Sequence, residues 1–128
     1  MAGVLPEELR RFILTSVPSV PFVEAMLLFR GAGRKPLTTG EIARRLYIGD
    51  AGAAEVIAQL QSSGIVQPAE VPATGHRYAP ATPELTALLD TLAAFYSTHL
   101  VQVTDMIHST TARKATQFAD AFRLRKDS

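Results

Sequence analysis

The chain has 128 residues, of which 47% are apolar and 20% are charged, with a net charge of +1 and no cysteine. This length and apolar fraction predict one domain with a single core and argue against a largely disordered chain. The lack of cysteine excludes disulfide bonds and cysteine-ligated zinc sites.

Two helices are expected in the first quarter of the chain. Residues 6–15 favour a short helix, because Pro6 suits an opening turn and two acids follow it. The segment Val17–Pro21 contains two prolines that interrupt this helix, and Ser19 is placed to cap a second one, Pro21–Arg30. The second helix is apolar on nearly every side, so we expect it to run through the core.

A pair of helices joined by a tight turn is predicted next. Thr38 and Glu41 have the spacing of a capping box, which would open a helix over Thr39–Tyr47. A second helix would follow over about residues 50–63. Gly64 suits the left-handed position that commonly ends a helix.

A β-hairpin is predicted after these helices. Ile65–Gln67 and Arg77–Ala79 have the character of short strands, and Pro68–His76 between them would form a wing. Pro68 and Pro72 cannot donate ladder hydrogen bonds, so the hairpin should be short or irregular.

A long helix is predicted from the cap at Thr82 to about His108, and a last helix over Ala112–Lys126. Apolar residues recur at three- and four-residue spacing along the long helix. This stripe predicts a homodimer seam formed by Leu85, Leu88, Leu92, Phe95, His99, Val103 and Met106. We expect residues 1–81 to hold the N-terminal helices, the helix pair and the hairpin, and residues 82–128 to form a C-terminal dimerisation region of one compact domain.

The stretch Leu37–Val66 contains the pattern Leu-Thr, Ile-Ala-x-x-Leu, a short turn, Val-Ile-x-x-Leu and Gly-Ile-Val, and an Arg-Tyr strand follows it. In this pattern the chain resembles the winged helix-turn-helix transcriptional regulators of the MarR and ArsR type, over about half of its length. The resemblance implies a mainly α fold with a small β-hairpin wing and a long C-terminal helix. It also implies a homodimer that binds double-stranded DNA.

Charge and position in the chain predict the candidate DNA contacts. Residues 1–49 carry seven bases against four acids, whereas residues 50–112 carry one base against six acids. A DNA-binding surface needs a basic footprint, which the first segment can supply. The resemblance and the charges together assign the contacts to Arg34, Lys35, Thr38, Arg44, Arg45, Gln59, His76 and Arg77.

The outward side of the second helix of the pair departs from the family pattern. Residues 51–55 read Ala-Gly-Ala-Ala-Glu, where the family commonly carries polar or basic base readers. Alanine offers no hydrogen-bond code, and Gln59 alone resembles a conventional base reader. We therefore expect binding mainly through the DNA backbone. The alternative is a protein–protein interaction module without DNA binding, whose partner would dock at Ala51, Ala54 and Glu55.

No catalytic motif, phosphate-binding loop or nucleophile arrangement is visible, so we expect neither an enzyme nor a cofactor. Asp105 and His108 have the spacing for two metal ligands, but no third ligand accompanies them, so no metal site is expected. The N-terminus lacks the long apolar stretch of a signal peptide, which predicts a cytoplasmic protein. Abundant alanine and a preference for arginine over lysine suggest a bacterial source.

Overall fold

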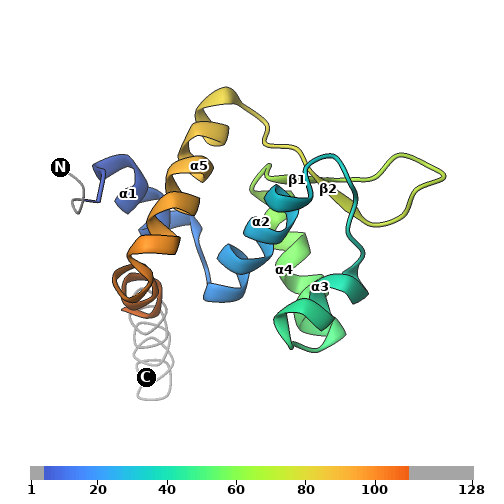
Figure 1. Ribbon diagram of the computed structural model, residues 1–128, viewed down its shortest axis with the longest axis horizontal. Helices are drawn as coiled ribbons and strands as arrows, with labels where there is room; N and C mark the ends of the chain where they lie inside the picture. The colour runs from blue at the N-terminus through green and yellow to red at the C-terminus, as the bar shows by residue number, and fades with distance from the viewer. Residues whose placement is uncertain (1–4, 110–128) are drawn as a thin grey trace, which may run out of the picture.

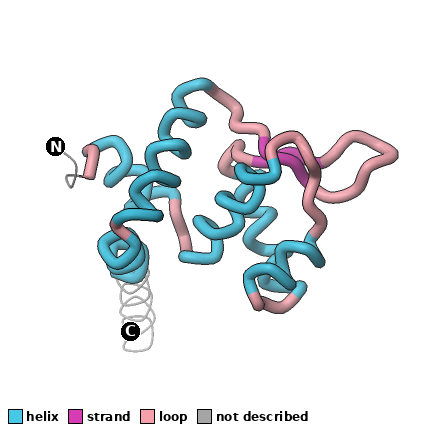
Figure 2. The backbone as a smooth tube through the Cα atoms, in the orientation of Figure 1, coloured by secondary structure: helices cyan, strands magenta, loops and turns pink. Residues whose placement is uncertain are grey.

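Helices dominate the part of the chain that the computed structural model describes, residues 5–109 (Figures 1 and 2). A small antiparallel sheet of two strands accompanies them. The elements in chain order are α1 (Glu7–Ser16), α2 (Val20–Ala32), α3 (Thr39–Leu46), α4 (Asp50–Ser62), β1 (Val66–Pro68), β2 (His76–Tyr78) and α5 (Pro83–Thr98).

The predicted caps at Ser19 and Thr82 are confirmed. The hydroxyl oxygen of Ser19 accepts a hydrogen bond from the backbone N–H of Phe22 (3.3 Å), which opens α2. The hydroxyl oxygen of Thr82 likewise accepts from the N–H of Leu85 (3.0 Å) at the start of α5. Each cap satisfies a backbone donor that the helix itself leaves without a partner.

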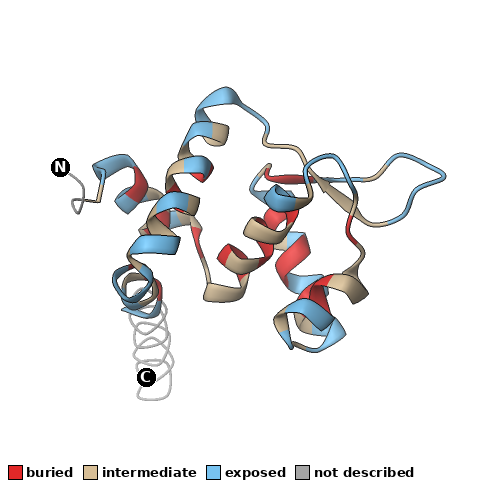
Figure 3. Cartoon of the chain, viewed as in Figure 1, coloured by how far each residue is buried: buried red, intermediate tan, exposed pale blue. Residues whose placement is uncertain are grey.

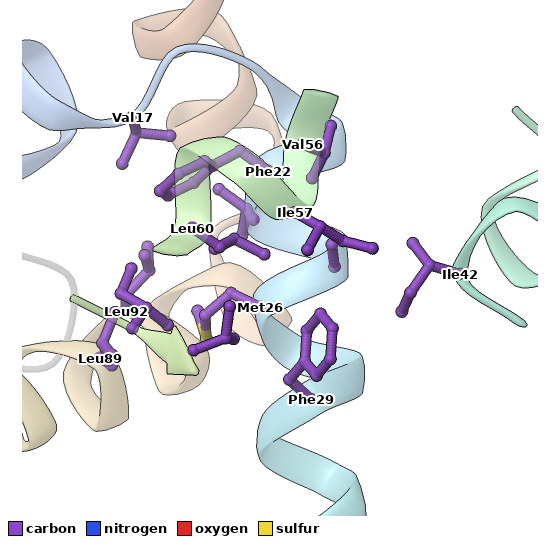
Figure 4. Close-up of a cluster of buried hydrophobic side chains, with 14 of the residues drawn as sticks. Val17, Phe22, Met26, Phe29, Ile42, Val56, Ile57, Leu60, Leu89 and Leu92 are labelled. Carbon is purple, nitrogen blue, oxygen red and sulfur yellow. The ribbon is translucent and has the colours of Figure 1, made fainter. Parts of the chain in front are cut away.

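The core is organised around α2, as its apolar sequence predicted. Phe22, Met26 and Phe29 are at most 1% exposed, and α3, α4 and the hairpin all contact this helix. Figure 4 shows side chains of α2, α4 and α5 meeting in one cluster, and Figure 3 marks in red the buried parts of the chain. Full burial of one such side chain stabilises the fold by about 1.5–3 kcal/mol.

Helices α1 and α5 contact each other (Figure 1). Two polar contacts at different positions along α5 also join it to α2. The Arg30 guanidinium of α2 pairs with the Asp90 carboxylate of α5 at 3.0 Å. One turn and a half further along, the Tyr96 hydroxyl donates to the Glu24 carboxylate at 3.2 Å. Burial, followed by the charge of Glu24, raises the pKa of Tyr96 to about 12. Tyr96 therefore remains a hydrogen-bond donor across the physiological pH range.

The hairpin is as short as predicted, but its strands begin and end one residue away from the predicted positions. Val66 faces Tyr78 and Pro68 faces His76 in the antiparallel register. Pro68 was expected to lie outside the strand. It is tolerated at the end of β1 because an edge strand can lack one ladder donor.

The hairpin is tied to the start of α3 by a bridge outside the two strands. The N–H groups of Leu37 and His76 each donate to the other residue's carbonyl oxygen, at 2.8 and 2.9 Å. Gly75 allows this approach, since its φ is +91° and a Cβ atom there would lie 2.4 Å from the Leu37 carbonyl oxygen. The bridge thereby fixes where α3 begins relative to the hairpin.

The prediction of one continuous helix from Thr82 to His108 is wrong. Helix α5 ends at Thr98, His99 leaves the helical region (φ −130°, ψ 45°), and a second helical segment runs over residues 100–109. The hydroxyls of Ser97 and Thr98 both donate to the carbonyl oxygen of Ala94. Such side-chain bonds to the preceding turn compete with the helix ladder and bend helices.

The predicted last helix, Ala112–Lys126, lies outside the described residues. Within residues 5–109, the buried apolar side chains of α1, α2, α3, α4, α5 and the segment 100–109 belong to one cluster.

No single helix among residues 5–109 has the length and apolar character needed to cross a bilayer. Helices α1 and α2 reach the required length only together, and the chain bends by 115° between them.

Candidate nucleic-acid interface

Helix α3 presents opposite chemistry on its two sides. Ile42 and Ala43 are buried against the core, whereas Arg44 and Arg45 are exposed. The capping box at its N-terminus determines which residues face inward, because it sets the residue at which the helix starts. The short amphipathic sequence of α3 thus places two adjacent guanidinium groups in solvent.

Three of the predicted basic residues line one open groove between α2 and α3. Lys35, Arg44 and Arg45 form its polar edge, and the groove has a volume of about 570 Å³. Leu27, Leu28, Gly31, Ala32 and Leu37 form its apolar floor. None of the three bases makes an ion pair within 4.0 Å of an acid in the described part of the chain. We call this surface, with Glu41, the basic groove.

The one acid of the basic groove is already occupied. A carboxylate oxygen of Glu41 accepts from the backbone N–H and from the hydroxyl of Thr38, both at 3.1 Å. These bonds, followed by the nearby charges of Lys35 and Arg44, lower the pKa of Glu41 below its usual value of 4.5. Glu41 therefore stays ionised at neutral pH and is used for capping, while the three cations remain available to an anion.

Thr38 was predicted both to cap α3 and to contact DNA, and the structure confirms the capping role. Its hydroxyl oxygen accepts the N–H of Glu41 (3.2 Å) while its hydroxyl hydrogen is donated to the Glu41 carboxylate. Both bonds hold the first turn of α3 closed. The side chain thereby positions the start of the helix that carries Arg44 and Arg45.

Gln59, the one conventional base reader of the prediction, is not part of the basic groove. It lines shallow pockets between α4 and the α1–α2 connection, next to Pro18 and Glu55. The exposed side of α4 offers the small side chains Ala51, Ala54 and Ala58 together with Glu55. Helix α4 contains no lysine or arginine.

His76 lies at the base of the wing and connects it to α4. Its Nε2 atom is 2.9 Å from the side-chain oxygen of Gln61, so a proton on Nε2 completes that hydrogen bond. The Nδ1 atom is buried and has no partner among the described residues. Burial lowers the pKa of His76. At neutral pH the ring is uncharged, and it supplies no cation for a phosphate.

The remaining predicted contacts lie apart from the basic groove or beside it. Arg34 is exposed on the loop after α2, directly before Lys35. Arg77 lies on β2, where its Nη2 atom donates to the side-chain oxygen of Gln67 at 3.4 Å. The structure thus gathers Lys35, Arg44 and Arg45, with Arg34 next to them in sequence, and leaves Arg77 on the hairpin.

The predicted dimer seam is divided between core and surface. Leu92 and Val103 are 0% exposed and pack within their own chain, so they need no second copy to be buried. The other five, Leu85, Leu88, Phe95, His99 and Met106, are half-buried. Leu100 and Val101, which the predicted seam did not include, are 50% and 71% exposed just after the break at His99.

Two residues near the ends of α3 and α4 have roles that were not predicted from the sequence. Tyr47 was predicted as the last residue of a helix, but it forms the turn between α3 and α4 with a left-handed backbone and a 95% exposed ring. Gln61 was not singled out, yet it holds His76. A signal for Tyr47 existed, since a tight turn between two helices commonly needs a left-handed residue. The partner of Gln61 is fifteen positions away and could not be found locally.

Among residues 5–109, no three histidine or acidic side chains come close enough together to hold a metal ion. No protein-family model, no curated protein and no solved structure matches the chain.

Proposed function

We propose that the chain is a winged helix-turn-helix protein that binds duplex DNA, chiefly through the phosphate backbone. The arrangement of α2, α3, α4 and the hairpin supports the fold assignment. Helices α3 and α4 pack on α2 and are separated by the short turn 47–49, and the wing follows α4 directly. Helix pairs of this kind commonly present their second helix to the major groove.

The observation that carries the DNA proposal is the basic groove. Lys35, Arg44 and Arg45 bring three cations to one surface, and the described acid among them is engaged with Thr38. Cations that replace the counterions of DNA phosphates supply most of the sequence-independent affinity of a DNA-binding protein. Arg34 extends the same positive surface onto the preceding loop.

The proposed binding reads little sequence. The exposed side of α4 carries methyl groups and the Glu55 carboxylate, which phosphate repels and which can accept a hydrogen bond from a base amine but cannot donate one. Phosphate contacts fix the position of a protein on DNA without specifying bases. We therefore expect similar affinities for unrelated duplexes.

Titration of a fluorescent random duplex across a salt series tests the proposal. For the wild-type chain we expect a Kd on the order of 10⁻⁴–10⁻⁶ M at physiological salt and a steep loss of affinity as salt rises. Arg44→Ala/Arg45→Ala should reduce the slope of log K against log salt by about 1.8, since each lost phosphate contact contributes about 0.9.

The matched control is Arg10→Ala/Arg11→Ala, which removes the same charge from the exposed side of α1. It should leave the slope nearly unchanged. If the wild-type chain does not bind duplex DNA at 20 mM salt, the proposal of DNA binding is wrong. If both double variants lower the slope equally, the basic groove is not the binding surface.

A second candidate function is a protein-interaction module. It is favoured by the exposed side of α4, where Ala51 and Ala54 leave room for close approach of another backbone beside Glu55. In that case duplex binding is absent at low salt. Ala54→Arg would then obstruct the partner, whereas in a DNA-binding protein the same variant should tighten duplex binding by adding a cation near the phosphates.

We further propose that the chain forms a homodimer through α5 and the segment 100–109. The proposal is supported by the exposed Leu100 and Val101 beside the half-buried Phe95 and Met106. Val101→Glu should weaken this contact because it would place a charge in an apolar interface. Sedimentation equilibrium at micromolar concentration should give twice the chain mass for the wild type, and a monomer mass would contradict the proposal.

A further inference from the structure

Tyr47 holds an unusual backbone conformation at the turn between α3 and α4. Its φ and ψ are 55° and 43°, and it is the one residue other than glycine with a positive φ among residues 5–109. The N–H of Ile48 reaches back to the carbonyl oxygen of Ala43 (3.1 Å), which closes the end of α3 around Tyr47. Glycine or asparagine commonly takes such a position, because other side chains strain it.

The Tyr47 ring contributes little to the stability of the fold, although the backbone at this residue is strained. Its side chain is 95% exposed, the highest value among the large apolar residues described as exposed. Nearly all of its area remains in water, so its burial adds almost nothing to the stability of the folded chain. The fold would be served as well or better by a residue that tolerates the left-handed region.

The surroundings of Tyr47 suit a polyanion. Arg44 and Arg45 precede it within three positions, and both are exposed. Ile48 after it is half-buried, and Gly49 and Ala51 add only small groups to the exposed start of α4. Asp50 and Glu55 are the nearest acids in sequence after the turn.

We propose that Tyr47 is an uncharged anchor on the DNA backbone. Its ring packs against a deoxyribose, and its hydroxyl donates a hydrogen bond to a phosphate oxygen next to those held by Arg44 and Arg45. Tyrosine hydroxyls are ordinary donors to DNA phosphates, and a hydrogen bond to a charged acceptor is stronger than one between neutral groups. This inference rests on the proposed DNA binding and names a residue of that same surface.

The salt dependence of DNA affinity distinguishes the expected contribution of Tyr47 from that of the arginines. Tyr47→Ala should weaken binding to a random duplex roughly tenfold at every salt concentration, because it removes a contact without removing a charge. Its slope of log K against log salt should equal that of the wild type. Arg45→Ala should instead lower the slope by about 0.9. Tyr47→Phe retains the ring and should recover part of the loss.

Thermal stability provides the second measurement. Tyr47→Asn should raise Tm by roughly 1–4 °C, since asparagine accepts the left-handed conformation at lower cost, and it should weaken DNA binding as much as Tyr47→Ala. A side chain with a purely structural role would show the opposite relation, with stability and binding falling together. Tyr47→Gly serves as a second variant with the same backbone freedom.

The outcomes distinguish the two proposals. If the wild type does not bind duplex at low salt, DNA binding fails and this inference fails with it. If the wild type binds and Arg44→Ala/Arg45→Ala weakens it while Tyr47→Ala and Tyr47→Phe match the wild type, only the role of Tyr47 is overturned. A Tm decrease in both Tyr47→Asn and Tyr47→Gly also overturns it.

Discussion

Helices α3 and α4 pack against each other and share one core, yet their outward surfaces differ in every chemical respect. Ile42 of α3 and Leu60 of α4 are both fully buried. Outside, α3 presents Arg44 and Arg45, whereas α4 presents alanines and acids and has no base. The inward sides are alike because the same core dictates them.

The difference teaches that, in the proposed DNA binding, phosphate contacts and base readout depend on different helices. The basic groove lies between α2 and α3, and none of the exposed alanines of α4 lines it. Electrostatic affinity needs only cations near phosphates, whereas base readout needs hydrogen-bonding side chains in the groove. The chain supplies the first on α3 and largely lacks the second on α4.

Truncating one buried residue of each helix tests whether α3 and α4 contribute equally to the core. Ile42→Ala and Leu60→Ala should each lower the free energy of unfolding by about 2–5 kcal/mol, because each leaves a cavity in a packed core. Urea denaturation monitored by circular dichroism measures both. A loss below about 1 kcal/mol for Ile42→Ala would show that α3 is only loosely docked.

A substitution at Gly75 tests the backbone bridge between the hairpin and the residues before α3. Gly75→Ala should lower the free energy of unfolding by about 2–3 kcal/mol, since φ is +91° and the new Cβ would clash with the Leu37 carbonyl oxygen. Gly49→Ala, at a site where a Cβ would meet nothing within 4 Å, is the control and should cost much less. Equal losses in the two variants would contradict the bridge.

A basic side chain introduced on α4 reduces the charge difference between the exposed surfaces of α3 and α4. Glu55→Lys should tighten binding to random duplex several-fold at low salt and steepen the salt slope by about 0.9 if α4 approaches the phosphates. Glu8→Lys on α1 makes the same charge change away from the proposed surface. If the two variants behave alike, only net charge matters and α4 does not approach DNA.

The capping box tests how strongly the N-terminus of α3 is held. Thr38→Ala should cost about 1 kcal/mol at pH 7, because the N–H of Glu41 loses its acceptor. The pKa of Glu41 is lowered in the folded chain, so its ionised form contributes stability above about pH 4.5 that is lost as the pH falls further. Denaturation between pH 7 and pH 3 should show this loss in the wild type and a smaller one in Glu41→Gln.

The smallest expected effect is the pH response of the wing. Burial lowers the pKa of His76 in the folded chain, so protonation favours the unfolded chain. Stability from this residue is complete above its ordinary pKa of about 6.5 and declines as the pH falls below that value. His76→Gln should flatten the stability profile between pH 7 and pH 5. An unchanged profile would mean that the buried Nδ1 atom is readily solvated.

Local patterns predicted the elements well because their causes are local. Ser19, Thr38 and Thr82 each cap a helix within three residues of themselves, and Gly64 takes the left-handed position after α4. The break at His99 was not predicted. It occurs where Ser97 and Thr98 both donate to the Ala94 carbonyl oxygen, and the regular apolar spacing around it does not reveal it.

The sequence by itself determined the helix starts, the apolar helix at the centre of the core and the contrast between a basic α3 and a base-free α4. These follow from capping, periodicity and charge, which act over a few residues. The tertiary structure alone decided which bases meet in one groove and that Gln59 faces the α1–α2 connection. It also placed Tyr47 in solvent with a strained backbone. These properties depend on how helices dock on one another, and docking is set by side chains far apart in the chain.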